Sequence, residues 1–326
     1  MRRTGIRNEV HTVKAWFLDE VHAPLRAAEI DRPVPGPGEV LMQVRASGLC
    51  HSDVGYMEGV IPVTIPFPVV LGHEASGVIA ELGDGVTGWA VGDAVASAIA
   101  PDDAPGVSRD GAYAEYTIVN ASKLVRLPAG MDWAQAAAAT DAGLTSYTGV
   151  VVFGEVRAGD RVGIVGLGGL GMTGAQIAVV QGATVYGVEP REALWETAKG
   201  HGVAEVFADV SELEGMDLDV VIDFAGFGTT TAGAIRAVKT RGRVVLVGLG
   251  RSEWTINSID LVSRAIELRG ATVAGEPAHL QAVIDLIAAG RLSVKAESIT
   301  FDEIPDGLGR LQRGEVNGRL VALLPE

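Results

Sequence analysis

The pattern of apolar and polar positions changes near residue 132, and the two halves of the chain predict different structures. Before that point, short runs of alternating apolar and polar residues are separated by turns, as at residues 39–46, which follow Pro33, Pro35 and Pro37. Further strands of this kind are expected at residues 69–71, 76–82, 93–100 and 113–119. The first half is therefore predicted to be mostly β-structure.

After an alanine-rich helix that begins near residue 134, continuous apolar strands alternate with helices. Six such strands are expected, at residues 161–165, 183–189, 203–208, 218–224, 243–249 and 267–274. Continuous apolar strands separated by helices are typical of a parallel sheet that is covered on both faces. Six of them predict a doubly wound, dinucleotide-binding (Rossmann) sheet, so the fold class is α/β with a second, β-rich part.

The C-terminal segment changes pattern again. An amphipathic helix at residues 279–289 ends at Gly290, and strands at 298–301 and 319–324 flank a helix at 304–311. We expect these strands to rejoin the β-rich first half.

Composition then excludes several classes of function. The 326 residues include 26 Lys and Arg against 41 Asp and Glu, and the net charge of −15 argues against a nucleic-acid partner, which needs a basic surface. A single Cys excludes an intramolecular disulfide framework and a four-cysteine zinc site. The 43 glycines are about twice the usual share of roughly 7%, which indicates tight turns and backbone that ligands approach closely.

The sequence gives no sign of a membrane partner or a secretory signal. No apolar run reaches the ~18 residues that a membrane span needs. Residues 1–12 carry Arg2, Arg3 and Arg7 but lack the apolar core of a signal peptide. We interpret them as a flexible extension and expect a cytoplasmic protein.

A glycine-rich loop follows the first strand of the expected parallel sheet and opens a helix. It has the pattern G-x-G-x-x-G and consists of Gly166, Leu167, Gly168, Gly169, Leu170 and Gly171. The first glycine permits the sharp turn, the second lets a diphosphate approach the backbone, and the third lets helix and strand pack closely. Because the helix N-terminus also offers N–H groups to phosphates, the loop predicts a bound dinucleotide rather than a turn without a ligand.

The next strand ends at Glu189, about 23 positions after Gly166 and near the expected spacing of ~20. A carboxylate there accepts hydrogen bonds from the ribose hydroxyls and repels a 2′-phosphate, which favours NAD. Arg191 lies close enough to serve a 2′-phosphate, so NADP stays possible. Val247 and Leu249, at the end of the fifth strand, are also expected to contact the cofactor.

Cys50, His73 and Asp141 are candidate metal ligands, each within a short motif: G-L-C-H-S-D at 48–53, G-H-E-A-S-G at 72–77 and T-D-A-G-L-T at 140–145. All three side-chain types bind zinc. Taken singly, however, a lone Cys is more often a small buried hydrophobe, a lone His a hydrogen-bonded core residue and a lone Asp a helix cap. The spacing alone leaves both interpretations open.

The run from Gly72 to Val86, G-H-E-x-x-G, five residues and then G-x-x-V, resembles the signature of zinc-containing alcohol dehydrogenases. From Val13 onward the chain is similar to the zinc-dependent branch of the medium-chain dehydrogenase/reductase superfamily. The resemblance implies a GroES-like, β-rich catalytic domain built from residues 1–144 and 275–326. A Rossmann NAD-binding domain at residues 145–274 is implied between them.

The resemblance also implies one catalytic zinc ion. Cys50 and His73 would be ligands, and Glu74 would be a nearby carboxylate that can enter the coordination sphere. Asp141 stands where familiar relatives have a second ligating Cys. One thiolate, one carboxylate and a neutral imidazole leave the site formally neutral with Zn²⁺, and whether Asp141 or Glu74 is the third ligand stays open.

Matching positions imply roles for five further residues. Asp53 would hydrogen-bond the ligating His and fix its tautomer. Ser52 would hydrogen-bond the substrate oxygen and begin proton transfer. Three residues would contact the cofactor, the first and last of them at its phosphates: His51, Thr145 and Arg319.

Two departures from the family pattern change these expectations. Gly55 replaces a relay His, so the proton is expected to leave Ser52 through the ribose hydroxyl and water. Residues 97–111 contain no Cys, so no structural zinc is expected, and Asp102 and Asp103 are expected to be solvated loop carboxylates. A homodimer or homotetramer through the Rossmann domain is expected.

These observations predict a zinc-dependent oxidoreductase that interconverts an alcohol and its aldehyde or ketone with NAD(H). Secondary or bulky substrates are favoured, because Ser52 is small and Ile61 and Ile99 occupy pocket-like positions. Two alternatives remain. One is a zinc-free reductase of C=C, quinone or imine bonds on the same fold, and the other is a dinucleotide-binding regulatory protein without turnover.

Overall fold

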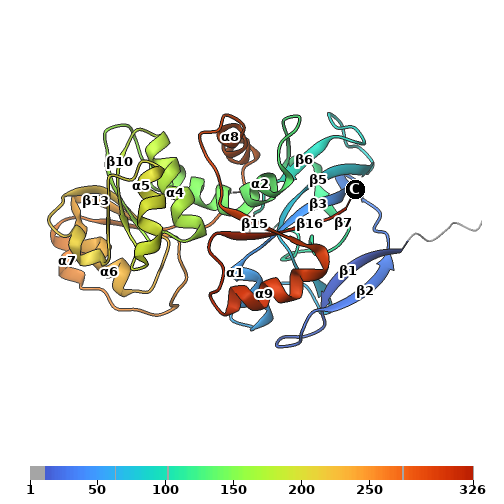
Figure 1. The fold of residues 1–326 in the computed structure, drawn as a ribbon, viewed down its shortest axis with the longest axis horizontal. Helices are drawn as coiled ribbons and strands as arrows, with labels where there is room; N and C mark the ends of the chain where they lie inside the picture. The colour runs from blue at the N-terminus through green and yellow to red at the C-terminus, as the bar shows by residue number, and fades with distance from the viewer. Residues whose placement is uncertain (1–11, 63, 101–102, 274, 326) are drawn as a thin grey trace, which may run out of the picture.

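A computed structural model of the chain describes residues 12–62, 64–100, 103–273 and 275–325. Its elements form two regions side by side, one around a six-stranded sheet and the other around a seven-stranded sheet (Figure 1). The predicted flexible extension lies outside the described residues, apart from Thr12, which begins the first strand.

The first region is a parallel sheet. In spatial order its strands are β11 (Glu205–Phe207), β10 (Thr184–Val188), β9 (Arg161–Val165), β12 (Leu218–Asp223), β13 (Val238–Leu246) and β14 (Glu267–Gly270). Each neighbouring pair is parallel. When the strands of this sheet are numbered by their order in the chain, their spatial order is 3-2-1-4-5-6. This is the arrangement of doubly wound dinucleotide-binding folds, so the predicted α/β fold class is confirmed.

Helices cover this sheet on both faces: α4 (Gly169–Val180), α5 (Trp195–Gly200), α6 (Thr229–Ala237) and α7 (Ser258–Ser263). The central strands β9 and β12 consist almost entirely of buried residues. Burial on both faces removes any need for polar alternation, which explains their continuous apolar runs.

The second region is a seven-stranded sheet that both ends of the chain build. Its path is β15 (Ala296–Thr300), β16 (Arg319–Leu323), β3 (Glu39–Leu49), β5 (Glu74–Leu82), β6 (Ala94–Ser97) and β8 (Leu124–Arg126), and β7 (Tyr116–Asn120) also pairs with β3. A smaller sheet contains β2 (Arg26–Asp31), β1 (Thr12–Leu18) and β4 (Val69–Val70). Because β16 pairs with β3, the predicted return of the C-terminal strands to the first half is confirmed.

Two short helices of this region, α1 (His51–Met57) and α9 (Ile304–Gln312), lie side by side (Figure 1). The sequence patterns do not predict α1. Single helical turns complete the connections: η1 (Ala121–Lys123), η4 (Glu192–Leu194), η5 (Val210–Leu213) and η6 (Phe301–Glu303). None of the helices in the described ranges combines the length and apolarity that a bilayer crossing requires.

A continuous helical segment joins the two regions. It consists of α2 (Trp133–Ala138), the π-helical turn η2 (Ala139–Gly143), α3 (Leu144–Tyr147) and a second π-helical turn, η3 (Thr148–Phe153). The helix α8 (Pro277–Ala288) packs against it (Figure 1). The predicted domain boundary after residue 144 falls within this segment and stays a prediction.

The register of β3 brings three strand ends together. Gly48 pairs with Glu74 at the start of β5, and Leu49 pairs with Leu320 at the start of β16. The residues just outside these pairs therefore meet at one end of the sheet: Cys50, His73 and Arg319.

Two ion pairs of Arg109 hold the loop within residues 97–111, where no structural zinc is expected. Arg109 lies 2.6 Å from Asp103 and 2.8 Å from Glu39. The expectation that Asp103 is solvated is wrong, since its carboxylate is paired and only 19% exposed. Asp102 lies outside the described residues.

Candidate metal and dinucleotide site

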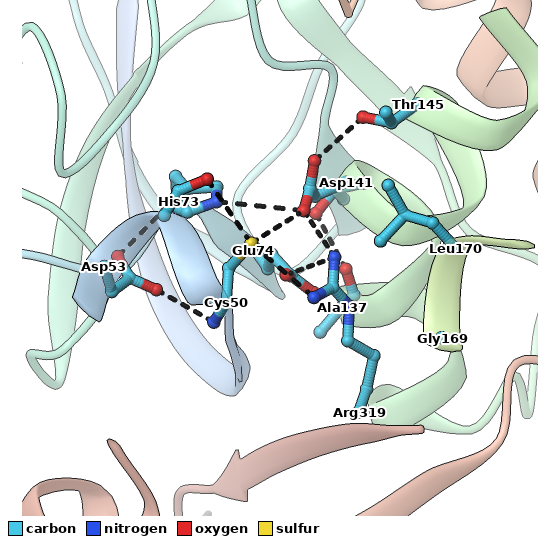
Figure 2. Close-up of polar contacts among 12 residues, drawn as sticks. Cys50, Asp53, His73, Glu74, Ala137, Asp141, Thr145, Gly169, Leu170 and Arg319 are labelled. Atoms are coloured by element: carbon cyan, nitrogen blue, oxygen red, sulfur yellow. Dashed lines mark hydrogen bonds and ion pairs between the residues drawn. The ribbon is translucent and has the colours of Figure 1, made fainter. Parts of the chain in front are cut away.

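Four ligand-type side chains meet where these strand ends converge (Figure 2). They are all buried, and their ligand atoms lie within 4.8 Å of one another: Cys50, His73, Glu74 and Asp141. Asp141 Oδ2 lies 3.4 Å from Cys50 Sγ and 3.8 Å from His73 Nε2. The fold thus brings together every residue that the sequence suggested for a metal site.

The separations and the chemistry of these donors suit a zinc ion. Zinc binds Cys sulfur at ~2.3 Å and His nitrogen or Asp oxygen at ~2.0–2.2 Å, almost always tetrahedrally. A tetrahedron with those bond lengths places neighbouring ligand atoms about 3.4–3.6 Å apart. The observed 3.4 and 3.8 Å are close to this spacing, so Cys50, His73 and Asp141 could hold a zinc ion with little rearrangement.

Asp141 reaches the cluster from the π-helical turn η2. Such turns interrupt α-helices rarely and are frequent at functional sites. Asp141 Oδ1 accepts a hydrogen bond from Thr145 Oγ1 at 2.9 Å, which leaves Oδ2 facing Cys50 and His73. Thr145, expected at the cofactor, therefore positions a candidate metal ligand.

His73 is oriented by Asp53, as the resemblance implies. Its Nδ1 lies 3.2 Å from Asp53 Oδ1, which leaves Nε2 facing the cluster. The fully buried Asp53 carboxylate also accepts hydrogen bonds from the Cys50 N–H at 3.0 Å and from the Tyr113 hydroxyl at 2.8 Å. Sequence patterns give no sign of this role for Tyr113, because a tyrosine in a strand-like run does not reveal the partner of its hydroxyl.

Burial and charge set the protonation of the cluster. Burial alone would lower the pKa of His73, but the Asp53 and Asp141 carboxylates outweigh it and raise that pKa well above its usual range. Burial raises the pKa of Glu74 to about 8, although Arg319 opposes the shift. A metal ion bound at His73 Nε2 would have to displace the proton there, so its affinity would fall as the pH falls.

Arg319 is only 3% exposed, and its guanidinium points into the cluster (Figure 2). Nη2 lies 2.6 Å from Asp141 Oδ2 and 3.2 Å from Glu74 Oε1, and Nη1 lies 3.5 Å from Cys50 Sγ. Burial would lower the pKa of Arg319, but the acidic groups around it raise that pKa, so the guanidinium stays charged. Its expected contact with cofactor phosphates stays a prediction.

The glycine loop has the geometry that its motif requires. Gly166 adopts a φ of 83°, and a Cβ at Gly171 would overlap the carbonyl oxygen of Gly166. A Cβ at Gly168, by contrast, would meet no described heavy atom within 4 Å outside its chain neighbours and own helix. Gly166 and Gly171 therefore serve the turn and its packing, whereas Gly168 leaves open space over the loop.

Glu189 lies beside this loop at the end of β10. Its Oε2 accepts a hydrogen bond from the Leu167 N–H at 3.0 Å, and its Oε1 accepts one from Arg191 Nε at 2.8 Å. Burial would raise the pKa of Glu189, but the hydrogen bonds from Arg191 outweigh it and lower that pKa. Of the two apolar residues expected at the cofactor, Val247 is partly buried and Leu249 is 81% exposed.

The loop and the cluster are adjacent. Leu170 in the loop accepts a hydrogen bond through its carbonyl from Ser146 Oγ at 2.8 Å, one residue after Thr145. Ser52 Oγ lies 3.6 Å from Cys50 Sγ. Partial burial and the positive charge of Arg319 lower the pKa of His51, which begins α1 beside the cluster. A dinucleotide on the loop would thus lie next to the four ligand-type side chains.

Comparisons with known families agree with this arrangement. Residues 36–129 match the model of the alcohol dehydrogenase GroES-like domain, and residues 169–289 match the model of the zinc-binding dehydrogenases. An alcohol dehydrogenase of Geobacillus stearothermophilus is 32% identical over 339 aligned positions, which cover 95% of this chain and 99% of that protein.

Solved structures of similar proteins share the whole fold. An acetophenone reductase from Geotrichum candidum in complex with NAD has a TM-score of 0.86 and 29% identity, and the match covers 96% of this chain and 97% of that one. A cobalt- and zinc-bound thermostable alcohol dehydrogenase from Pyrobaculum aerophilum has a TM-score of 0.87 and 26% identity, with 96% and 100% covered.

Two glycine substitutions are expected to separate the folding role of the loop from its binding role. Gly171→Ala forces a Cβ against backbone and should cost about 1–3 kcal/mol of stability. Gly168→Ala adds its Cβ in open space and should leave the melting temperature unchanged while it weakens NADH binding. Thermal unfolding and NADH fluorescence titration measure the two effects. Unchanged NADH affinity in Gly168→Ala would contradict the assignment of this loop to the diphosphate.

Proposed function

The chain belongs to the medium-chain dehydrogenase/reductase superfamily and is an alcohol or carbonyl oxidoreductase of the alcohol dehydrogenase type, and we propose that it uses NAD(H) and one zinc ion to interconvert a secondary or bulky alcohol and its carbonyl partner. Similarity to an acetophenone reductase, which acts on a bulky ketone and was solved with NAD, supports the substrate class and the cofactor.

One observation carries the proposal. The buried thiol of Cys50, imidazole of His73 and carboxylate of Asp141 have spacings that suit tetrahedral zinc. They lie beside a glycine loop that opens a helix. A zinc ion held there would act as a Lewis acid on the substrate oxygen, and a dinucleotide on the loop would exchange the hydride.

The chain's own residues supply positioning and a path for the proton. Asp53 fixes the ring of His73 through Nδ1, and Tyr113 in turn holds Asp53. Ser52 Oγ lies 3.6 Å from Cys50 Sγ, and this hydroxyl would accept the proton of a substrate alcohol. Since Gly55 offers no relay, the proton would continue through the ribose hydroxyl and water.

Asp141 is proposed as the third ligand, rather than Glu74. Asp141 Oδ2 faces both Cys50 Sγ and His73 Nε2 at ligand-like distances, and Thr145 fixes the carboxylate's orientation. Arg319 Nη2 lies 2.6 Å from Asp141 Oδ2 and 3.2 Å from Glu74 Oε1, so a metal ion at Asp141 would leave the guanidinium paired with Glu74. The Glu74 carboxylate is therefore expected to balance Arg319 and not to bind the metal in the resting state.

Matched substitutions test the ligand set. Asp141→Asn keeps the side chain's size but removes the anionic oxygen. Loss of a group that only hydrogen-bonds a ligand weakens metal binding about 10- to 100-fold, so loss of a ligand should lower zinc affinity at least as much. Glu74→Gln should retain one zinc ion per chain. The measurements are elemental zinc analysis, a zinc competition titration and NAD(H)-linked rates with a panel of alcohols and ketones.

Several results would count against this function. Retention of zinc by Asp141→Asn together with its loss in Glu74→Gln would reverse the assignment of the third ligand. A zinc-free chain that reduces C=C, quinone or imine bonds would support a different reductase. A chain that binds NAD(H) but turns over no alcohol or ketone would indicate a regulatory protein.

NAD is proposed over NADP because the Glu189 carboxylate lies beside the glycine loop, where it could accept hydrogen bonds from the ribose hydroxyls of a bound dinucleotide and would repel a 2′-phosphate. Glu189→Gln keeps an acceptor for the Leu167 N–H but removes the charge and frees Arg191. The ratio of NADH to NADPH in kcat/KM should fall on the order of tenfold, because a charged hydrogen bond contributes about 1.5 kcal/mol. Glu192→Gln, on an exposed neighbour, is the control. An unchanged ratio would show that Glu189 does not select the cofactor.

A homodimer or homotetramer through the Rossmann domain is also proposed. In the described part of the chain, β14 pairs only with β13, so its outer edge is open. Ile259, Val262 and Leu268 are exposed apolar residues on α7 and β14. Light scattering should report at least twice the chain mass of 33.8 kDa, and a monomer would contradict the proposal. The cytoplasmic location expected from the sequence stays a prediction.

A further inference from the structure

Arg319 contacts two of the atoms that a zinc ion would use as ligands. Its guanidinium donates to Asp141 Oδ2 at 2.6 Å and to Cys50 Sγ at 3.5 Å, and both atoms belong to the proposed ligand set. A zinc ion bound to Asp141 Oδ2 and Cys50 Sγ would bring a second positive charge close to this guanidinium, and the two cations would repel each other. Metal binding is therefore expected to displace Arg319 from Asp141 and Cys50.

Glu74 would remain the ion-pair partner of the displaced guanidinium. Its Oε1 is 3.2 Å from Arg319 Nη2, and its Oε2 has no hydrogen-bond partner among the described residues. The charges also balance. A Cys50 thiolate and the Asp141 carboxylate would neutralise Zn²⁺, and an ionised Glu74 would neutralise the one guanidinium. Arg319 thus remains the buried counter-charge of Glu74 when Asp141 and Cys50 bind the metal.

The displaced side chain would lie next to the glycine loop at residues 166–171. The carbonyl oxygen of Gly318, one residue before Arg319, is 3.1 Å from where a Cβ on Gly169 would lie, and Gly169 is the first residue of α4. Arg319 Nε is buried and has no hydrogen-bond partner among the described residues. A diphosphate at the start of α4 offers a partner for it, because helix N-termini and arginines both bind such anions.

We propose that Arg319 couples metal binding to cofactor binding, an inference that rests on the proposed function. Zinc releases the guanidinium from Asp141 and Cys50 and makes it available to the diphosphate. The diphosphate in turn draws Arg319 away from the ligand atoms and so strengthens zinc binding. Thermodynamic linkage requires the two effects to be equal in size.

The test compares ligands that differ in the diphosphate alone. ADP-ribose carries the adenosine and diphosphate but no nicotinamide, so any zinc dependence of its binding cannot come from a ring that touches the metal. Adenosine lacks the phosphates. Calorimetry with chelator-stripped and zinc-loaded wild-type chain should show about tenfold tighter binding of ADP-ribose with zinc, within the range of typical couplings, and no change for adenosine. Zinc transfer to a competing chelator should weaken by the same factor when ADP-ribose is present.

Variants identify the side chain that carries the coupling. Arg319→Met should bind ADP-ribose with the same affinity in both zinc states, and Arg319→Lys should keep part of the difference because it keeps the charge. Arg313→Met removes an arginine that pairs with the exposed Glu315 and should leave the coupling intact. Circular dichroism confirms that each chain is folded before the titrations.

The outcomes separate this inference from the proposed function. A wild-type chain that binds both zinc and ADP-ribose, each independently of the other, overturns the coupling alone. A folded Arg319→Met variant that shows the same coupling as wild type also overturns the inference. If that variant does not fold, the comparison of zinc-free and zinc-loaded wild type still decides. A chain that binds no zinc or no ADP-ribose contradicts the proposed function and the coupling with it.

Discussion

The site depends on how β3 is paired with its two neighbours. Antiparallel pairing with β5 and β16 fixes which residues lie at these strand ends: Cys50 just after β3, His73 just before β5, and Arg319 as the first residue of β16. A slip of one residue in either ladder would turn these side chains to the opposite face of the sheet. Because β16 comes from the far end of the chain, the candidate metal ligands and the arginine beside them come together only in the complete fold.

The second constraint is the cost of burying charge. Asp53, Glu74 and Asp141 are buried acids, and such groups persist only when they are paired or hydrogen-bonded. Asp53 is satisfied by three donors, whereas Glu74 and Asp141 share Arg319. Arg319 gives these two acids a cationic partner, and this accounts for the proximity of an arginine to the candidate metal ligands.

Much of the fold was accessible from sequence because its signals are local. The six parallel strands follow from continuous apolar runs, and the loop at Gly166 follows from its glycine spacing. The cluster was accessible only through a resemblance, since Cys50 and Asp141 lie 91 residues apart and no pattern joins them. The roles of Tyr113, Thr145 and Arg319 at the cluster were not accessible, because tertiary packing decides which partner a hydroxyl or guanidinium meets.

The central claim is that one zinc ion binds at Cys50, His73 and Asp141, with Glu74 left to Arg319. Anomalous diffraction from crystals of the zinc-loaded chain, collected on both sides of the zinc absorption edge, tests it most directly. One strong peak per chain is expected, within about 2.0–2.3 Å of Cys50 Sγ, His73 Nε2 and an Asp141 oxygen. No peak at this position, or a peak bound by Glu74 in place of Asp141, would contradict it.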